Sequence, residues 1–375
     1  MDAIKEQSRT AALPDVRGAH GPGCLNDWLE PGYEPPRLLI PESIPYEEWK
    51  ERRRGLIGAS DAGAIMAWAE SWPASDRPYG SALSVAHRLI SGAGFDSREP
   101  QWGVKAPAEM GRLFEDSLWE MYQARSPHVE DLGKPGTYQN PSLDRIVATP
   151  DRIVRDPTRP EGLQRGLVQI KMVFSTGAAK WKRRGEVAIP AGVVAQMMQE
   201  MAVCGWASFN DCAVFIDSEP HVIRVEWCQS YWGRLADALQ RFFHVVDNPE
   251  ELPSLIDGSQ DAAGVVEERS KERDEDIDLG QEWPGILERI EELKESKKQL
   301  DFDIRELETR LKSELGGASV GWCDGWRVTC RAQERRTLDG TKLKKEDPET
   351  WGKYIKTTKT RGVLRIGRVS NGVAG

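Results

Sequence analysis

The chain has little of what marks a metal-cluster protein, a secreted disulfide scaffold or a membrane protein. Its six cysteines are scattered, with no two separated by two residues, which argues against a zinc ribbon or disulfide framework and favours reduced thiols. The five histidines are equally scattered, without the spacing that brings two onto one metal ion. No segment approaches the roughly 20 apolar residues that cross a bilayer, and the N-terminus lacks a charged start followed by an apolar run. We therefore expect a cytoplasmic protein with no membrane role.

The chain also lacks an excess of positive charge. Its formal net charge of −9 argues against a protein that coats nucleic acid through bulk charge, although local basic surfaces stay possible. With 39% hydrophobic and 30% charged residues in 375, the chain has enough apolar material for a globular core. Its length predicts two or three domains.

Hydrophobic pattern and local charge divide the chain into five parts. Residues 1–40 are rich in Gly, Pro and charge and predict a mobile segment. Residues 41–250 alternate helical stretches with short strands, notably 144–154 and 166–174, which predicts a mixed α/β domain with a central mixed sheet flanked by helices. An acidic linker (251–285), a long amphipathic helix (286–317) and a small basic α+β unit (318–375) follow.

Charge counts and a heptad pattern support the last three parts. Residues 257–292 hold 13 Asp or Glu against 4 Lys or Arg, whereas residues 321–368 hold 13 Lys or Arg against 6 Asp or Glu. Between these stretches, apolar residues recur with alternating spacings of four and three, interrupted only by Lys297: Ile286, Ile290, Leu293, Leu300, Ile304, Leu307 and Leu311. The tail is either a basic surface that follows DNA or a docking module whose helix recruits a partner or another subunit.

One group of polar residues suggests chemistry on phosphodiesters. Pro150 and Asp151 end one predicted strand, and Gln169 and Lys171 lie on the next. Side chains two apart on a strand share a face, so residues 169 and 171 point together towards whatever Asp151 binds. This arrangement suits a site in which acidic groups hold Mg²⁺ and a lysine contacts the attacking water.

Five segments occur in an order that resembles the lambda-exonuclease and YqaJ-like viral recombinase family: residues 53–65, 110–122, 148–154, 166–174 and 190–201. The resemblance covers roughly residues 45–245, and the joint order is far more specific than any single segment. It implies a restriction-endonuclease-like core and a hydrolase that degrades duplex DNA from 5′ to 3′, leaving 3′ single-stranded tails for phage-type recombination. It also implies two Mg²⁺ or Mn²⁺ ions, a duplex with a free end, a single-strand annealing protein, a trimeric ring of identical subunits and a bacterial host cell.

The resemblance also assigns roles to particular residues. It makes Asp151 the central metal ligand, Gln169 the position of the second acidic ligand and Lys171 the catalytic lysine. Glu115, on an amphipathic helix, helps to hold the metals or their waters, and Gln196 begins the helix that packs under the active centre.

Arg53 and Ser60 predict a pocket for a terminal phosphate. Residues 58–60 lie where a helix would begin, so exposed amides, a hydroxyl and a guanidinium can grip an anion there. The resemblance identifies this as the pocket for the 5′ phosphate. A clamp on the strand end would place the first scissile bond at the metals.

The family normally has Glu where this chain has Gln169, and Tyr where it has Val193. A neutral amide can offer a carbonyl oxygen, but it removes a negative charge from a site that binds a hard dication. Either Gln169 is a variant that still works, or the chain is a DNA-end-binding or interaction protein that kept the fold and lost hydrolysis.

Several of these side chains also have a plainer explanation. Glu115 can be solvated on its helix, Ser60 can be a helix cap, and Gln196 can be an ordinary polar helix position. Arg53 belongs to the run 52–54, and such charge runs usually face solvent.

Overall fold

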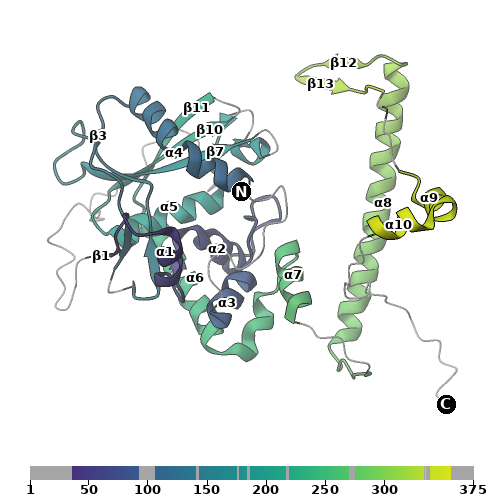
Figure 1. Ribbon diagram of the computed structural model, residues 1–375, viewed down its shortest axis with the longest axis horizontal. Coiled ribbons are helices and arrows are strands. Elements are labelled where there is room, and N and C mark those ends of the chain that lie inside the picture. The colour runs from purple at the N-terminus through teal and green to yellow at the C-terminus, as the bar shows by residue number, and fades with distance from the viewer. Residues whose placement is uncertain are drawn as a thin grey trace. The chain divides into compact units, whose positions relative to one another are not determined.

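The computed structural model of the chain describes residues 36–92, 106–140, 143–174, 177–183, 186–216, 219–269, 275–332, 334 and 338–355. The chain divides into two compact units, Met1–Ser270 and Lys271–Gly375 (Figure 1). The predictions for residues 1–35, and those for the part of the basic unit beyond residue 355, lie outside the described residues.

The first unit contains seven α-helices and eleven strands among its described residues. The helices are α1 (Tyr46–Arg52), α2 (Ala62–Ala69), α3 (Ala82–Ser91), α4 (Ala106–Arg125), α5 (Ala191–Cys204), α6 (Gln229–Asp247) and α7 (Gln260–Arg269), with short 3-10 helices at Ala59–Asp61, Ala178–Trp181 and Pro249–Leu255. The strands are β1 (Arg37–Ile40), β2 (Ile57–Gly58), β3 (Glu130–Asp131), β4 (Thr137–Gln139), β5 (Ile146–Ala148), β6 (Arg152–Arg155), β7 (Arg165–Val173), β8 (Lys182–Arg183), β9 (Glu186–Val187), β10 (Phe209–Ile216) and β11 (Glu219–Glu226).

The larger sheet has the strand order β11-β10-β7-β6-β3 and is mixed. β6 and β7 form an antiparallel pair, while β7 and β10 run parallel through the crossover helix α5. Alternation along β7 gives the sheet two faces: Val168 and Ile170 pack with α4, and Leu167 packs with α5. In Figure 1, α5 lies between this sheet and helices α2 and α6. Gln169 and Lys171 therefore point to the α5 side.

The smaller sheet, ordered β1-β4-β5-β2, holds the N-terminal elements of the unit. β1 pairs antiparallel with β4 and buries Ile40 completely, so residues 37–40 belong to the fold, although the sequence places them in a mobile segment. α2 and α5 cross at two glycines, because a Cβ on Gly63 would lie 2.7 Å from the Cα of Gly192. Glycine is required there for close approach.

The compact part of the first unit continues past residue 250, where the sequence analysis ends the catalytic domain. Leu252 and Leu255 of the 3-10 helix and Ala262 and Val265 of α7 are buried in the main hydrophobic core. Two acidic residues of this segment also contact the first unit: Asp257 pairs with Arg77 at 2.6 Å, and Asp261 accepts from the backbone N–H and the hydroxyl of Ser81 at 2.9 and 2.8 Å. A count of charge does not register these contacts, which explains why it predicted a linker over 251–285. Only the last part of that segment, from residue 271, is assigned to the second unit.

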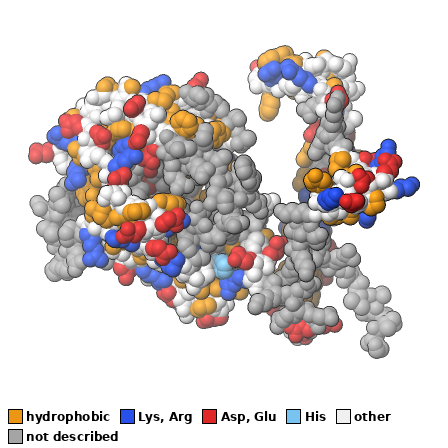
Figure 2. All heavy atoms as spheres, viewed as in Figure 1, with side chains coloured by type: hydrophobic (Ala, Val, Ile, Leu, Met, Phe, Trp, Pro, Cys, Tyr) orange, Lys and Arg blue, Asp and Glu red, His pale blue; other side chains and the backbone are white. Residues whose placement is uncertain are grey.

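The second unit contains α8 (Trp283–Leu315), the hairpin of β12 (Val320–Cys323) and β13 (Trp326–Thr329), α9 (Gly340–Glu346) and α10 (Pro348–Tyr354). α8 occupies the segment predicted as a long helix and ends at Gly316, whose φ of 56° is left-handed. Its apolar seam is exposed, by 43% to 64% at Ile286, Leu293, Leu300, Ile304, Leu307 and Leu311. Trp322 and Trp326 are 74% and 73% exposed, and Figure 2 shows hydrophobic side chains beside basic ones on this hairpin.

The predicted fold class is confirmed: the first unit is a mixed α/β domain whose central mixed sheet is flanked by helices. None of the helices in the described part of the chain is both long and apolar enough to cross a membrane.

Candidate active site

Asp151, Gln169 and Lys171 meet where β6 begins and β7 nears its end. The Asp151 carboxylate accepts hydrogen bonds from the backbone N–H of Ile170 and from Nε2 of Gln169, each at 2.6 Å. The antiparallel β6–β7 pair fixes this register, since Arg152 lies opposite Val168. The predicted approach of Asp151 to the 169–171 face therefore occurs in the structure.

Gln196, on α5, connects the two strand residues to one another. Its Oε1 accepts a hydrogen bond from Nζ of Lys171 at 3.1 Å, and its Nε2 donates to Oε1 of Gln169 at 2.8 Å. The same Nε2 donates to Oε1 of Glu200, one helical turn further, at 2.9 Å. An ammonium only donates and a carboxylate only accepts, so Lys171 and Glu200 together fix the orientation of this amide.

That orientation also fixes how Gln169 faces the site. Its oxygen is engaged by Nε2 of Gln196, so its nitrogen is the atom that meets Asp151. In this orientation the carbonyl oxygen of Gln169 points away from Asp151, so it is not placed as the substitute metal ligand that the sequence suggested. A carboxylate at position 169 would present an acceptor to Asp151, whereas the amide presents a donor.

Glu200 is part of this site, and sequence reasoning missed it. Only 1% of Glu200 is exposed, and besides Gln196 its carboxylate accepts a hydrogen bond from Nδ2 of the fully buried Asn210 at 2.8 Å. The available signal was its position four residues after Gln196, which places both on one helix face. A lone Glu in the apolar stretch after Gln196 is otherwise easily taken for a solvated helix residue.

The two inner carboxyls of the site are hard to ionise. Burial raises the pKa of Asp151 from its ordinary value of 3.8 to about 6, against the lowering effects of Lys171 and of the Ile170 amide. Burial likewise raises the pKa of Glu200 to about 7, and the nearby charge of Asp151 adds to the shift. Perturbed carboxyls of this kind cluster at functional sites.

Glu115 lies beside this group and is held by cations. Its Oε1 accepts a hydrogen bond from the buried Arg152 at 3.0 Å and lies 3.2 Å from Nζ of Lys134. The same two cations contact Asp116, which pulls the pKa of that carboxyl down. Nη1 of Arg152 also donates to the backbone oxygen of Asp151 at 2.9 Å, so one guanidinium ties Glu115 to the central aspartate's backbone.

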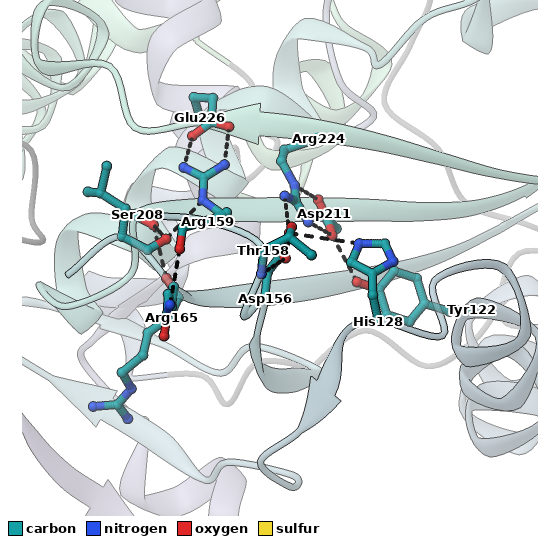
Figure 3. A network of polar contacts seen from close by, with 12 residues as sticks. Tyr122, His128, Asp156, Thr158, Arg159, Arg165, Ser208, Asp211, Arg224 and Glu226 are labelled. Atoms are coloured by element: carbon teal, nitrogen blue, oxygen red, sulfur yellow. Dashed lines mark hydrogen bonds and ion pairs between the residues drawn. The ribbon is translucent and has the colours of Figure 1, made fainter. Parts of the chain in front are cut away.

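A second polar network holds α4, and with it Glu115, against the sheet (Figure 3). The hydroxyl of Tyr122, two helical turns after Glu115, donates to Asp211 of β10 at 2.8 Å. Asp211 is paired with Arg224 of β11 through two contacts of 2.8 and 2.9 Å, and Arg224 also reaches Asp156 at 2.6 Å. Both aspartates are 1% exposed, so this buried and paired network fixes the helix in position.

Arg53 and Ser60 lie around the backbone turn that leads into α2. Only 9% of Arg53 is exposed, its guanidinium stacks 4.3 Å over the Trp49 ring, and burial lowers its pKa to about 10. A Cβ on Gly58 would lie 1.9 Å from Nη2 of Arg53 and 3.7 Å from Oγ of Ser60, so all three are close together. The interpretation of Arg53 as part of a solvated charge run is wrong, because its side chain is buried against this turn.

The turn at Gly58 and the Asp151 group are joined through buried contacts. Nε1 of Trp49 donates to the hydroxyl of Thr137 at 2.9 Å, and that hydroxyl lies 2.8 Å from the hydroxyl of Thr149, two residues before Asp151. From the other side, Nε2 of Gln199 on α5 contacts backbone oxygens of β2 and β5 at 3.5 and 3.3 Å. α1, α5 and the two sheets therefore hold both parts of the candidate site in one framework.

The donors of the site suit a hard divalent cation in part. Asp151 and Glu115 supply carboxylate oxygens, which such cations prefer, and Glu200 adds negative charge within the same network. Lys171 supplies the ammonium that the sequence pattern calls for, oriented by Gln196. Gln169 is the exception, because its amide nitrogen faces Asp151.

Comparisons with known proteins find similar sequences and structures. Residues 48–207 match the sequence model of the YqaJ-like viral recombinase domain. The chain is 23% identical over 323 residues to the uncharacterized protein YqaJ of Bacillus subtilis (strain 168), a match that spans 84% of this chain and 92% of that protein. Similar solved structures include the alkaline exonuclease LHK-Exo of Laribacter hongkongensis, at 19% identity and a TM-score of 0.41 over 54% of this chain and 93% of that one. A phage-related exonuclease from Haemophilus somnus 129PT matches at 11% identity and a TM-score of 0.38 over 52% of this chain and 94% of that one. The resemblance inferred from the sequence is confirmed, since residues 48–207 are similar to the YqaJ-like viral recombinase domain.

Proposed function

We propose that this protein is a Mg²⁺- or Mn²⁺-dependent exonuclease that degrades duplex DNA from 5′ to 3′ and leaves 3′ single-stranded tails for recombination. The observation that carries the proposal is the hydrogen-bonded group of Asp151, Gln169, Lys171 and Gln196, built into the same framework as Arg53 and Ser60. A carboxylate with an oriented lysine suits phosphodiester hydrolysis, and a buried arginine at a backbone turn in the same framework suits a strand end.

In this mechanism, the chain's own residues position the reactants. Asp151 and Glu115 would hold two divalent ions, which when bound polarise the scissile phosphate and lower the pKa of the attacking water. Lys171 would contact that water, and Gln196 keeps its ammonium in place through the 3.1 Å hydrogen bond. Helix α5 packs behind these side chains and keeps their geometry fixed, and fixed positioning of reactants is a large part of catalysis.

Arg53, Ser60 and the backbone amides at the start of α2 would bind the 5′-terminal phosphate. The buried guanidinium is already oriented by Trp49 and Gly58, so it would lose little conformational freedom on binding. Because burial has already removed most of its water, an anion that reaches it gains a strong, charge-assisted contact. The terminal phosphate would thereby set which bond is cut first.

The same proposal includes partners and a place of action. A duplex with a free end is the substrate, and a ring of identical subunits, three by family resemblance, would enclose it. A single-strand annealing protein would take up the 3′ tails. The proposed site of action is the cytoplasm of a bacterial host cell.

A second candidate is a DNA-end-binding or interaction protein without hydrolysis. One observation favours it: Gln169 presents an N–H to Asp151 where a metal ligand would present an oxygen. In that case the Arg53 pocket would still recognise a strand end, while the Asp151 group would hold a cation too weakly for turnover.

One experiment separates the two candidates. The protein is incubated with linear duplex DNA labelled at either the 5′ or the 3′ end and with Mg²⁺ or Mn²⁺, using Lys171→Ala and closed circular DNA as controls. The proposed exonuclease releases the 5′ label first, spares the circle and loses its activity in the Lys171 variant. Binding of ends without release of either label in any divalent cation would instead establish the non-catalytic candidate.

A further inference from the structure

Glu200 is buried, and among the described residues the hydrogen bonds to its carboxylate come from neutral groups. Its two oxygens accept from the amides of Gln196 and Asn210, at 2.9 and 2.8 Å. Burying a carboxylate without a neighbouring cation is unfavourable, and hydrogen bonds from neutral side-chain amides offset the desolvation energy only in part. A purely structural acceptor at this position would be better served by a neutral side chain, so the charge itself needs an explanation.

The charges around Glu200 do not balance. Arg152 and Lys134 are both engaged by Glu115 and Asp116 on the α4 side of the sheet. On the α5 side, the hydrogen-bonded group contains the carboxylates of Asp151 and Glu200 but one ammonium, that of Lys171. When both carboxyls are ionised, one negative charge is left over in a desolvated site, and a bound cation would neutralise it.

We propose that Glu200 is a positioning residue of the active site, which supplies from helix α5 the negative charge that Gln169 does not supply from strand β7. The inference rests on the proposed metal-dependent function of this site. Glu200 reaches Gln169 through a single side chain, the amide of Gln196, which donates one N–H to each of them. A partner one step outside the metal ligands typically changes metal affinity or activity about 10- to 100-fold when it is replaced.

Glu200 has a second effect, through the orientation of Gln196. When ionised, its carboxylate can only accept, so it holds Nε2 of Gln196 towards itself and leaves Oε1 facing the ammonium of Lys171. Replacing Glu200 by Gln keeps the size of the side chain but removes one of the two charged groups that orient the amide of Gln196. The variant would lose the charge and hold Lys171 less firmly.

The test compares the full-length protein with Glu200→Gln, with the double variant Gln169→Glu/Glu200→Gln, and with Glu226→Gln as a control. Glu226 undergoes the same chemical change, but it pairs with Arg159 in the separate network of Figure 3. Mn²⁺ binding is measured by electron paramagnetic resonance, and thermal unfolding is followed in EDTA and in Mg²⁺.

We expect Glu200→Gln to bind Mn²⁺ about 10- to 100-fold more weakly than the wild type. It should melt at a higher temperature than the wild type in EDTA, since the buried charge is gone, and gain less from Mg²⁺. The double variant, which moves the carboxylate from α5 to β7, should recover Mn²⁺ binding, and the control should match the wild type in Mn²⁺ binding and in the stabilisation it gains from Mg²⁺.

Unchanged Mn²⁺ binding in Glu200→Gln, or absence of Mn²⁺ binding in the wild type, would overturn the role given to Glu200. Failure of the proposed exonuclease gives a different result: wild-type protein that binds Mn²⁺ through Glu200 yet releases no nucleotide from linear DNA. The two failures are therefore distinguished by one set of proteins.

Discussion

The substitution Gln169→Glu tests the chemistry of the site most directly. It replaces the N–H that now faces Asp151 at 2.6 Å with a second carboxylate oxygen, while the other oxygen still accepts from Gln196. The remaining contacts of Gln196, to Lys171 and Glu200, need not change. The substitution therefore replaces the hydrogen bond between Gln169 and Asp151 with two adjacent carboxylates, which repel each other unless a proton or a cation lies between them.

The structure predicts the direction and the rough size of two effects of this substitution, one on stability without metal and one on Mg²⁺ affinity. Without metal, the loss of a hydrogen bond to a charged group should lower the free energy of unfolding by about 1.5–3 kcal/mol. For a unit of this size that corresponds to a melting temperature roughly 3–12 °C lower. With metal, the added carboxylate should raise the apparent affinity for Mg²⁺ by at least about tenfold, the lower limit typical of a change one step outside the metal shell.

The assay is a Mg²⁺ titration of nucleotide release from linear duplex DNA, run beside thermal unfolding in EDTA. The expected result is faster degradation at every subsaturating Mg²⁺ concentration, together with reduced stability when metal is removed. A variant that is destabilised in EDTA but no faster at any Mg²⁺ concentration would refute the account of Gln169 as a weakened ligand position. Glu226→Gln again serves as the matched control outside the site.

Three further predictions follow from the same geometry. Arg53→Ala should reduce the preference for 5′-phosphorylated over 5′-hydroxyl ends, and an unchanged ratio of cleavage rates would exclude this pocket. Burial raises the pKa of Asp151 from 3.8 to about 6, so its protonated form should stabilise the metal-free protein fully below about pH 4, and this stabilisation should be lost as the pH rises through 6. Mg²⁺ affinity should rise over the same pH interval. Calorimetry at pH 4.5 and 7.5, with Asp151→Asn as control, measures both the stability and the affinity. A protein ending near Gly280 should keep its folded first unit but lose DNA affinity or assembly, as judged by circular dichroism, light scattering and salt-dependent DNA binding; an unfolded product would show that the second unit is needed for the core.

Much of the site could be predicted because strand periodicity carries it. Gln169 and Lys171 are two residues apart on β7, so their shared face follows from backbone geometry alone, and the turn after Pro150 brings Asp151 to them. Burial of Arg53 could not be predicted in this way. It depends on Trp49 of α1 and on a glycine five residues later, and neither contact leaves a periodic signal in the sequence.

The boundary of the first unit also escaped the sequence analysis, for a related reason. Charge counting averages over a helix, whereas packing depends on one face of it. α7 buries Ala262 and Val265, and its Asp261 accepts hydrogen bonds from Ser81, so a window that sums charge does not describe the packed face of this helix. The same limitation concealed Glu200, whose side chain points inward from a helix that is otherwise largely apolar.

Gln169 by itself does not decide between a working and a disabled enzyme. A metal site needs negative charge near the cation, and a carboxylate at another position can supply it. A carboxylate on α5 linked to Gln169 through one amide is close enough to act on the same cation, yet far enough that it need not be a ligand. The consequence is a graded one: metal affinity weaker than with Glu at position 169, but stronger than in a site with Asp151 as the sole inner carboxylate. We expect Mn²⁺ affinity to fall in the order Gln169→Glu, wild type, Glu200→Gln. That order tests whether Glu200 supplies the missing charge, while nucleotide release from linear DNA decides whether the chain hydrolyses DNA or only holds its end.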